Sequence, residues 1–290
     1  MAWQRWRERL IEFCIRACGI SSIAIVTLIF IFLLKEGLAV FRTISVAAFL
    51  GGRHWYPISD PPLFGILPLI VGSGAVTIGA VVLSVPIGIA SALFISEIAK
   101  GYSKDILKTG IELFAAIPSV VLGFIGMTAL APLLKQTFHL PTGLTALTGS
   151  ITLAFMAMPT IVSITEDALA AVPRGHREAA LALGATRWQM MVHVLLPAAG
   201  SGIVAAVMLG IGRVIGETMA VMMVTGNAAV IPHTLLQPVR TLTATIAAEM
   251  GETVRGSDHY AALFAIGIVL FVISFVINML ADLFLHRDRN

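Results

Sequence analysis

The sequence predicts an all-α polytopic membrane protein with six transmembrane helices. Of its 290 residues, 58% are hydrophobic and 12% are charged, and the mean hydropathy is +0.94. Soluble domains carry about 25% charged residues, so this composition excludes that class. A helix needs about 20 apolar residues to cross a bilayer. Runs of that kind recur at about 17–34, 66–95, 110–131, 144–165, 198–224 and 259–284.

The segment before the first run predicts an amphipathic helix lying in the membrane interface. Within residues 1–16, Trp3, Trp6, Leu10 and Phe13 recur at helical spacing, with Arg and Glu between them. No Ala-x-Ala cleavage site follows before Lys35, so the first span is expected to be retained. We therefore divide the chain into an interfacial helix (1–16), a first span with an external segment (17–65), a helical core (66–285) and a cytoplasmic tail (286–290).

The distribution of basic residues predicts that both termini are cytoplasmic. Six spans place both ends on one side of the membrane, and cytoplasmic loops carry the excess of Lys and Arg. Of the 19 Lys and Arg residues, twelve fall on the side of the termini and six on the other side, while Arg213 falls inside the fifth run.

Two charged residues lie in the fifth apolar run, within the segment 209–220. An ionised side chain at mid-membrane costs at least about 2.5–3.5 kcal/mol, so it must face protein, water or a charged solute. The spacing of four predicts that Arg213 and Glu217 share one face of a continuous helix. One expectation is that they form a positively charged constriction through which an anion passes. The alternative is that they only neutralise each other and hold two helices together. Gly212 and Gly216 form the small-xxx-small pattern of close helix packing.

A polar stretch between the fourth and fifth runs carries a spaced motif, at residues 178–197. Glu178, Ala179 and Ala180 favour a short helix, and Gly184 is expected to end it. The order Glu-Ala-Ala, three residues, Gly, nine residues, then Val-x-Leu-Pro resembles the EAA loop of ABC importer permeases, with Val194 in place of Ile. The alternative is an ordinary amphipathic inner loop. The resemblance implies a type I ABC importer permease (MetI-like) fold, in which this helix sits in a cleft of the ATPase subunit.

Three further stretches resemble the PstC-type subunit of phosphate-specific importers, at residues 64–73, 211–221 and 239–252. The main departure is Ser73, where that family more often has Thr. The resemblance implies a path for phosphate through the bacterial inner membrane. It also implies a PstA-type second permease in a heterodimer, an ATPase dimer, a periplasmic or lipid-anchored phosphate-binding protein, and surrounding lipid. The substrate-path residues it implies are Arg213, Gly216, Glu217 and Thr218.

The chain itself carries no sign of catalysis. It has no Gly-x-x-x-x-Gly-Lys-Ser/Thr motif to cradle nucleotide phosphates, so ATP hydrolysis is expected in a separate subunit. No catalytic residue, metal site, cofactor or nucleic-acid surface is expected. The rival readings are a permease for sulfate or molybdate, an ATP-independent channel or secondary carrier, and an intramembrane enzyme. Glu166 and Asp167 are expected to cap or solvate a helix end, and His193 to pack beside the inner loop.

Overall fold

The computed structural model describes residues 2–287; Met1 and residues 288–290, the end of the predicted tail, lie outside it. The first part of the chain forms these elements: α1 (Ala2–Gly37), a 3₁₀ turn (Leu38–Arg42), α2 (Val46–Gly51), β1 (Trp55–Tyr56), β2 (Leu63–Phe64), α3 (Leu67–Leu93), a π turn (Phe94–Ile98), α4 (Tyr102–Ala115), α5 (Ser119–Ile125), a π turn (Gly126–Leu130) and α6 (Ala131–Thr137). The second part forms α7 (Ala146–Ala171), α8 (Arg174–Ala182), α9 (Arg187–Met190), a π turn (Met191–Leu195), α10 (Leu196–Ala198), α11 (Gly200–Gly216), α12 (Met219–Val224), α13 (Leu242–Glu249) and α14 (Asp258–Arg287).

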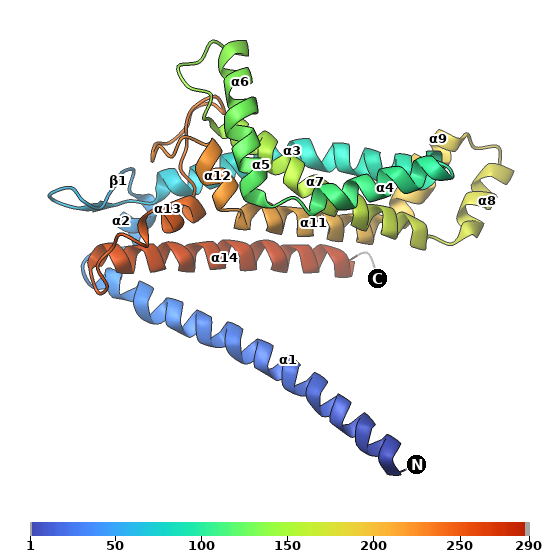
Figure 1. Cartoon of the computed structure of the whole chain (residues 1–290), viewed down its shortest axis with the longest axis horizontal. Helices are drawn as coiled ribbons and strands as arrows, with labels where there is room; N and C mark the ends of the chain where they lie inside the picture. The colour runs from blue at the N-terminus through green and yellow to red at the C-terminus, as the bar shows by residue number, and fades with distance from the viewer. Residues whose placement is uncertain (1, 288–290) are drawn as a thin grey trace.

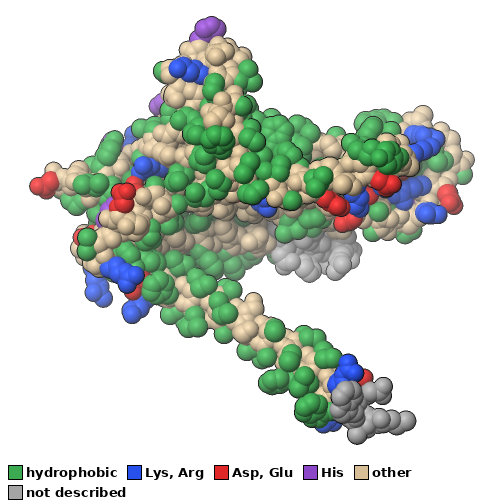
Figure 2. All heavy atoms as spheres, viewed as in Figure 1, with side chains coloured by type: hydrophobic (Ala, Val, Ile, Leu, Met, Phe, Trp, Pro, Cys, Tyr) green, Lys and Arg blue, Asp and Glu red, His purple; other side chains and the backbone are tan. Residues whose placement is uncertain are grey.

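The long helices lie side by side and form a bundle, with short elements at both ends. Helices α3, α7, α11 and α14 run along the bundle, while α1 diverges from α14 towards its N-terminal end (Figure 1). The short antiparallel pair of β1 and β2, with Trp55 opposite Phe64, lies at one end together with α2 and α13. At the other end lie α8 and α9. On the face shown in Figure 2, charged side chains gather mostly at the two ends, and hydrophobic ones cover the middle.

Five described helices are long and apolar enough to cross a membrane. They cover Trp6–Arg42, Leu67–Ile98, Ser119–Thr137, Ala146–Ala171 and Asp258–Met279. The sixth candidate is a bent pair of segments, Arg187–Ala198 and Gly200–Gly216, which meet at 73°. The mostly helical architecture with five to six spans confirms the predicted fold class.

The third span lies further along the chain than predicted. We expected a continuous span over 110–131, but α4 ends at Ala115 and the crossing helix begins again at Ser119. Pro118 explains the break, because a proline pushes the residue before it, here Ile117, away from helical dihedrals. The apolar residues on both sides of this break belong to two helices. The residues that follow this run, from Pro132, are also helical, and this proline lies in the first turn of α6.

Helix α1 runs without interruption through residues that the sequence divides into an interfacial helix and a first span. It extends from Ala2 to Gly37, so the two segments form one helix. Its C-terminal end packs on α14, where a Cβ on Gly37 would lie 2.9 Å from the backbone nitrogen of Ala265. The interfacial location of its N-terminal part stays a prediction.

One buried isoleucine joins the three central helices. Ile161 of α7 is 1% exposed. A Cβ on Gly88 of α3 would lie 2.8 Å from its Cγ2, and a Cβ on Gly210 of α11 would lie 2.7 Å from its Cγ1. Both glycines therefore allow close approach at the same side chain. Consequently, α7 cannot shift without meeting α3 and α11, because packed interiors leave few voids.

Candidate functional site

The fifth span is broken at the position of its predicted anion site. Helix α11 ends at Gly216, and α12 begins at Met219. Glu217 between them is extended, with φ −70° and ψ 132°. The prediction that Arg213 and Glu217 share one face of a continuous helix is therefore wrong. Gly216 has a low helix propensity, and the side chain of Glu217 offers a local alternative, because its Oε1 accepts the Ala220 N–H at 3.2 Å.

A second helix holds this break from the outside. The hydroxyl of Thr243, in the first turn of α13, donates a hydrogen bond to the carbonyl oxygen of Glu217 at 2.9 Å. Ser73 of α3 accepts the N–H of Leu242 at 2.9 Å, so the start of α13 is fixed to α3 as well. Residues 226–258 belong to no predicted span, yet Leu242 to Thr245 are buried. This part of the segment therefore enters the bundle and packs on the break.

Arg213 lies in the last turn of α11 and is exposed. A cation is favoured there, because the helix dipole is negative at its C-terminal end. Among the side chains that the structure describes, its guanidinium forms no ion pair with Glu217 or with another carboxylate. In this conformation, Arg213 and Glu217 therefore do not neutralise each other.

The two glycines beside Arg213 face open space in this chain. A Cβ built on Gly212 or Gly216 meets no atom within 4 Å among the described residues. Thr218 follows in the break, and its hydroxyl donates to the Gly216 carbonyl at 3.2 Å. At these two glycines, the predicted small-residue pattern thus faces none of the described helices of its own chain.

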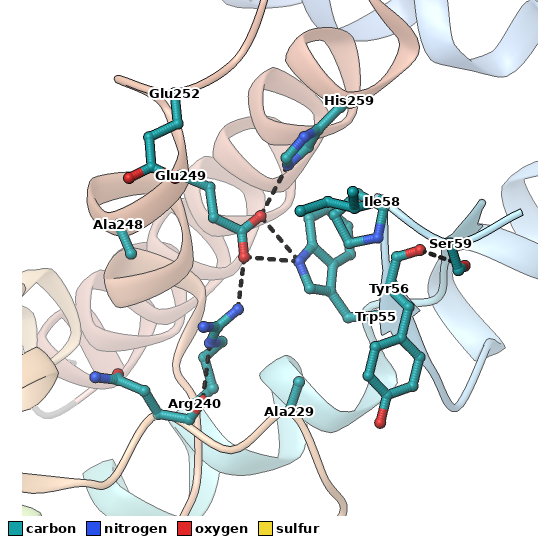
Figure 3. A pocket seen from close by; sticks show the side chains of 12 residues that line it. Trp55, Tyr56, Ile58, Ser59, Ala229, Arg240, Ala248, Glu249, Glu252 and His259 are labelled. Carbon is teal, nitrogen blue, oxygen red and sulfur yellow. Dashed lines mark hydrogen bonds and ion pairs between the residues drawn. The ribbon is translucent and has the colours of Figure 1, made fainter.

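The structure adds a polar cluster at the end of the bundle that holds α13, which the sequence did not indicate. The Glu249 carboxylate forms hydrogen bonds with Arg240 Nη1 at 2.5 Å, Trp55 Nε1 at 3.1 Å and His259 Nε2 at 2.8 Å (Figure 3). The four residues come from the β1 strand, the α12–α13 loop, α13 and α14. They line a cavity of about 770 Å³ together with the exposed Glu252. The cluster ties the outer end of α13 to the rest of this face.

At the opposite end, the predicted short helix is α8. It ends where the motif requires: Gly184 has φ +82°, its N–H donates to Leu181 O at 3.0 Å, and the Ala185 N–H donates to Ala180 O at 3.1 Å. These two bonds form a Schellman cap, which favours glycine at the left-handed position. The prediction that Gly184 ends this helix is confirmed. Of the motif residues, Glu178 and Ala179 are exposed, and Ala180 is buried in the inner core.

The surface of this inner loop is apolar at its tip. Leu183 is 90% exposed, and Leu181 and Trp188 are exposed as well. Large exposed apolar side chains grouped in this way are typical of a docking surface. Next to them, Thr186 and Gln189 form a reciprocal capping box that begins α9. His193 is also exposed, so the expectation that it packs beside the loop is wrong.

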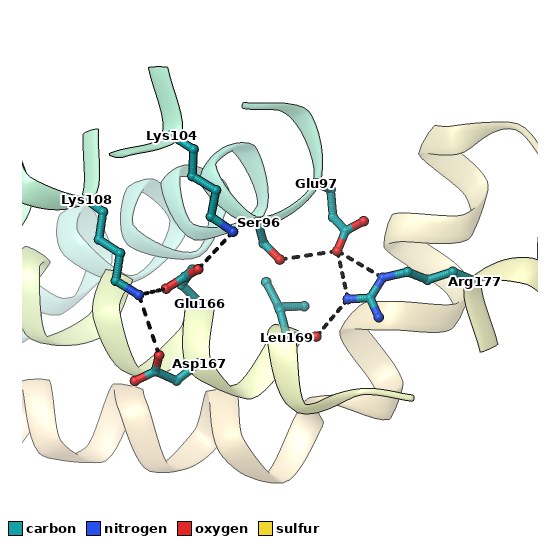
Figure 4. A network of polar contacts seen from close by, with 8 residues as sticks. All are labelled: Ser96, Glu97, Lys104, Lys108, Glu166, Asp167, Leu169 and Arg177. Carbon is teal, nitrogen blue, oxygen red and sulfur yellow. Dashed lines mark hydrogen bonds and ion pairs between the residues drawn. The ribbon is translucent and has the colours of Figure 1, made fainter. Parts of the chain in front are cut away.

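Near the same end, two lysines of α4 bind a buried carboxylate of α7. Glu166 accepts Lys108 Nζ at 2.8 Å and Lys104 Nζ at 3.3 Å (Figure 4). Glu166 is 5% exposed, so our expectation that it caps or solvates a helix end is wrong. The hydrogen bond to Glu166 raises the pKa of the Lys108 ammonium above its ordinary value. These pairs hold α4 against α7, and Asp167 lies at their edge, 4.0 Å from Lys108.

Together, the broken span, the exposed arginine at the break and the capped helix at one end define a membrane-spanning transport protein. The family model described as "Binding-protein-dependent transport system inner membrane component" matches residues 84–289, and the chain belongs to this family. It is therefore an inner membrane component of such a system.

Relatives and solved structures agree with this assignment. The "Probable ABC transporter permease protein YqgH" of Bacillus subtilis (strain 168) is 44% identical over 268 residues, 92% of this chain and 87% of the relative. The "Phosphate transport system permease protein PstC" of Mesorhizobium japonicum is 37% identical over 259 residues, 83% of this chain and 78% of the relative.

Two solved transporters share the fold at low sequence identity. A bacterial ABC transporter that imports the acidic polysaccharide alginate superposes with a TM-score of 0.62 at 17% identity, over 96% of this chain and 99% of that one. The MetNI methionine ABC transporter, in an inward-facing conformation, superposes with a TM-score of 0.58 at 21% identity, over 77% and 94%. The predicted type I permease fold is therefore confirmed.

Proposed function

We propose that this chain is the membrane-spanning subunit of an ATP-driven phosphate importer and forms the path for inorganic phosphate with a second, different permease. The observation that carries the proposal is the exposed Arg213 at the break of the fifth span. A charge at that depth does not face lipid without a cost of at least about 2.5–3.5 kcal/mol. Its exposed side is therefore directed at a water-filled seam. The PstC relatives, 31–37% identical over most of the chain, support phosphate as the anion.

The chemistry of Arg213 suits a passing oxyanion. Its guanidinium is always protonated and presents planar donors that match phosphate oxygens. Transport also requires release, so the site must bind weakly. Glu217 weakens it electrostatically and accepts a hydrogen bond from a protonated phosphate oxygen, which sulfate does not offer. Gly216, which ends α11, and Thr218, which precedes α12, flank the extended Glu217, and the backbone there lies beside the path.

The second permease covers the open side of α11. Gly212 and Gly216 have no neighbour within 4 Å of a built Cβ, which leaves room for a helix of another subunit. A heterodimer with a PstA-type partner would place Arg213 at the seam between the two chains. Substitution of Gly212 by Leu is expected to prevent association with that partner. Co-purification of the two permeases measures this effect, and unchanged recovery of the partner would contradict it.

The remaining subunits follow from the two ends of the bundle. A pair of ATPases binds α8 through Glu178, Ala179 and the exposed leucines, and supplies the hydrolysis that this chain does not perform. Both ends of the described chain point to the same side as α8 (Figure 1), which carries most of the basic residues. This arrangement supports the proposal that both termini are cytoplasmic. A periplasmic or lipid-anchored phosphate-binding protein delivers the anion to the opposite face.

The proposal is tested in vesicles that contain both permeases, the ATPases and the binding protein. Arg213→Gln should abolish uptake of labelled phosphate while the complex still assembles. Arg255→Gln is the matched control, because Arg255 is exposed in the external loop before α14. Uptake at the wild-type rate in the Arg213→Gln complex would refute the role of the arginine.

The same vesicles separate the rival functions. Uptake of sulfate or molybdate in preference to phosphate would assign the chain to another oxyanion. Uptake without ATPase subunits would indicate a channel or a secondary carrier. Glu217→Gln should impair phosphate uptake or broaden it towards sulfate, and wild-type rate and selectivity in that variant would leave Glu217 a structural role at the break only.

A further inference from the structure

A single arginine joins α8 to the two helices that precede it in the bundle. Arg177 lies within α8, yet its side chain turns back to the bundle (Figure 4). Its Nη1 donates to the carbonyl oxygen of Val172 at 2.8 Å, and its Nη2 donates to that of Leu169 at 2.8 Å. The Glu97 carboxylate accepts from Nε at 3.2 Å and from Nη2 at 2.9 Å.

These acceptor groups lie at the C-terminal ends of two helices. Leu169 is in the last turn of α7, where its carbonyl also accepts the Val172 N–H at 3.3 Å. Val172 is the C-terminal cap, and carbonyls at this end of a helix lack the usual donor from the following turn. Glu97 lies in the π turn that ends the α3 segment. Side chains of Arg177 and Glu97 are 20% and 12% exposed, which limits screening by solvent. One guanidinium thus satisfies three groups from two helices, with donors fixed in a planar fork that an ammonium or an amide lacks.

The contacts continue from this arginine to the break. Helices α3 and α7 pack on each other and on α11, and Ile161 fills the space between Gly88 and Gly210. Gly210 lies three residues before Arg213 on α11. A displacement of α8 therefore reaches Arg213 through helices in direct contact.

From this geometry we infer that Arg177 is a positioning residue for coupling: it transmits the movement of α8 to α3 and α7, so that ATP hydrolysis drives opening of the path. The inference rests on the proposed function, because it requires ATPases bound to α8. Contiguity alone does not establish coupling, so the test measures coupling directly.

The experiment compares phosphate transported with ATP hydrolysed in vesicles that contain the full transporter. Arg177→Gln should retain hydrolysis and lower the ratio of phosphate to ATP at least about fivefold, the lower end of coupling effects. Arg174→Gln, on the same helix and exposed, is the matched control and should keep the wild-type ratio. Co-purification of the ATPases confirms assembly. If Arg177→Gln does not assemble, Arg177→Lys, which keeps the charge without the planar fork, is measured in its place.

A merely structural arginine would lower hydrolysis and uptake together and leave the ratio unchanged, and that result would overturn the inference.

Glu97→Gln and the double variant complete the test. Because both residues form one network, the double variant should lower the ratio by less than the product of the two single effects. Failure of the proposed function looks different: the wild-type complex would then carry no phosphate. In that case, stimulation of the ATPase by the binding protein replaces uptake as the readout, and loss of this stimulation in Arg177→Gln still tests the arginine.

Discussion

Thr243 provides a direct test of whether the break in the fifth span is held from outside the span. Its hydroxyl donates to the Glu217 carbonyl at 2.9 Å, and the residue is 8% exposed. Valine has nearly the same shape but no donor, so Thr243→Val removes this bond and fills the same space.

The magnitude follows from the loss of the partner of a mostly buried acceptor. A hydrogen bond contributes about 0.5–1.5 kcal/mol net, and an acceptor left without a partner costs about 1–3 kcal/mol. We expect the extended conformation of Glu217 to lose an amount in this range relative to a helical one. Since 1.4 kcal/mol is a factor of about ten, a loss of about 1–1.4 kcal/mol, where the two ranges overlap, should lower uptake at limiting phosphate about five- to tenfold.

The assay is the initial rate of phosphate uptake at low and at saturating phosphate, in vesicles with the full transporter. Thr245→Val is the matched control, because that hydroxyl is also buried on α13 but donates only to Thr241 O of its own first turn, at 2.8 Å. Thr243→Ser should keep the donor and restore uptake. Equal rates for Thr243→Val and Thr245→Val would refute the idea that α13 holds the break.

Three further predictions concern stability and are measured by thermal unfolding of the isolated subunit. Gly210→Ala should destabilise by about 1–3 kcal/mol, because its Cβ meets Ile161 at 2.7 Å, whereas Gly212→Ala, in open space, should not; equal shifts would contradict this packing. Gly184→Ala should cost about 1–2 kcal/mol at φ +82°, and no loss relative to Gly175→Ala in open space would refute the cap. Glu249→Gln should cost about 1.5–3 kcal/mol through its charged partners, and unchanged unfolding would show that the cluster is not stabilising.

The sequence predicts well what depends on neighbouring residues. Apolar runs locate the spans, because any helix in lipid needs a long uncharged stretch. The end of α8 at Gly184 is also local, since only the dihedrals of one glycine and the two bonds of the cap decide it. The predicted position of the third span was wrong for the opposite reason. Hydropathy continues across Pro118, while the backbone does not.

Polar clusters were missed because their members are far apart in the chain. Glu249 is 194 residues from Trp55, and Glu166 is 58 residues from Lys108. No periodicity relates such positions, and a buried carboxylate looks in the sequence like an exposed one. The costs of burying a charge do predict that partners exist. They do not predict which residues those partners are.

The fifth span shows why a motif that is easy to find can still be misread in its geometry. Spacing of four places Arg213 and Glu217 on one helix face only if the helix continues, and a glycine alone does not end a helix inside a membrane. At the break, the freed Glu217 carbonyl needs a donor, and Thr243 provides it from 26 residues further on. The break is therefore stabilised by α13 from outside the span, in addition to the local bond between Glu217 and Ala220. It separates the two charges: Arg213 remains on a rigid helix end, and Glu217 becomes part of a segment whose conformation depends on a neighbouring helix.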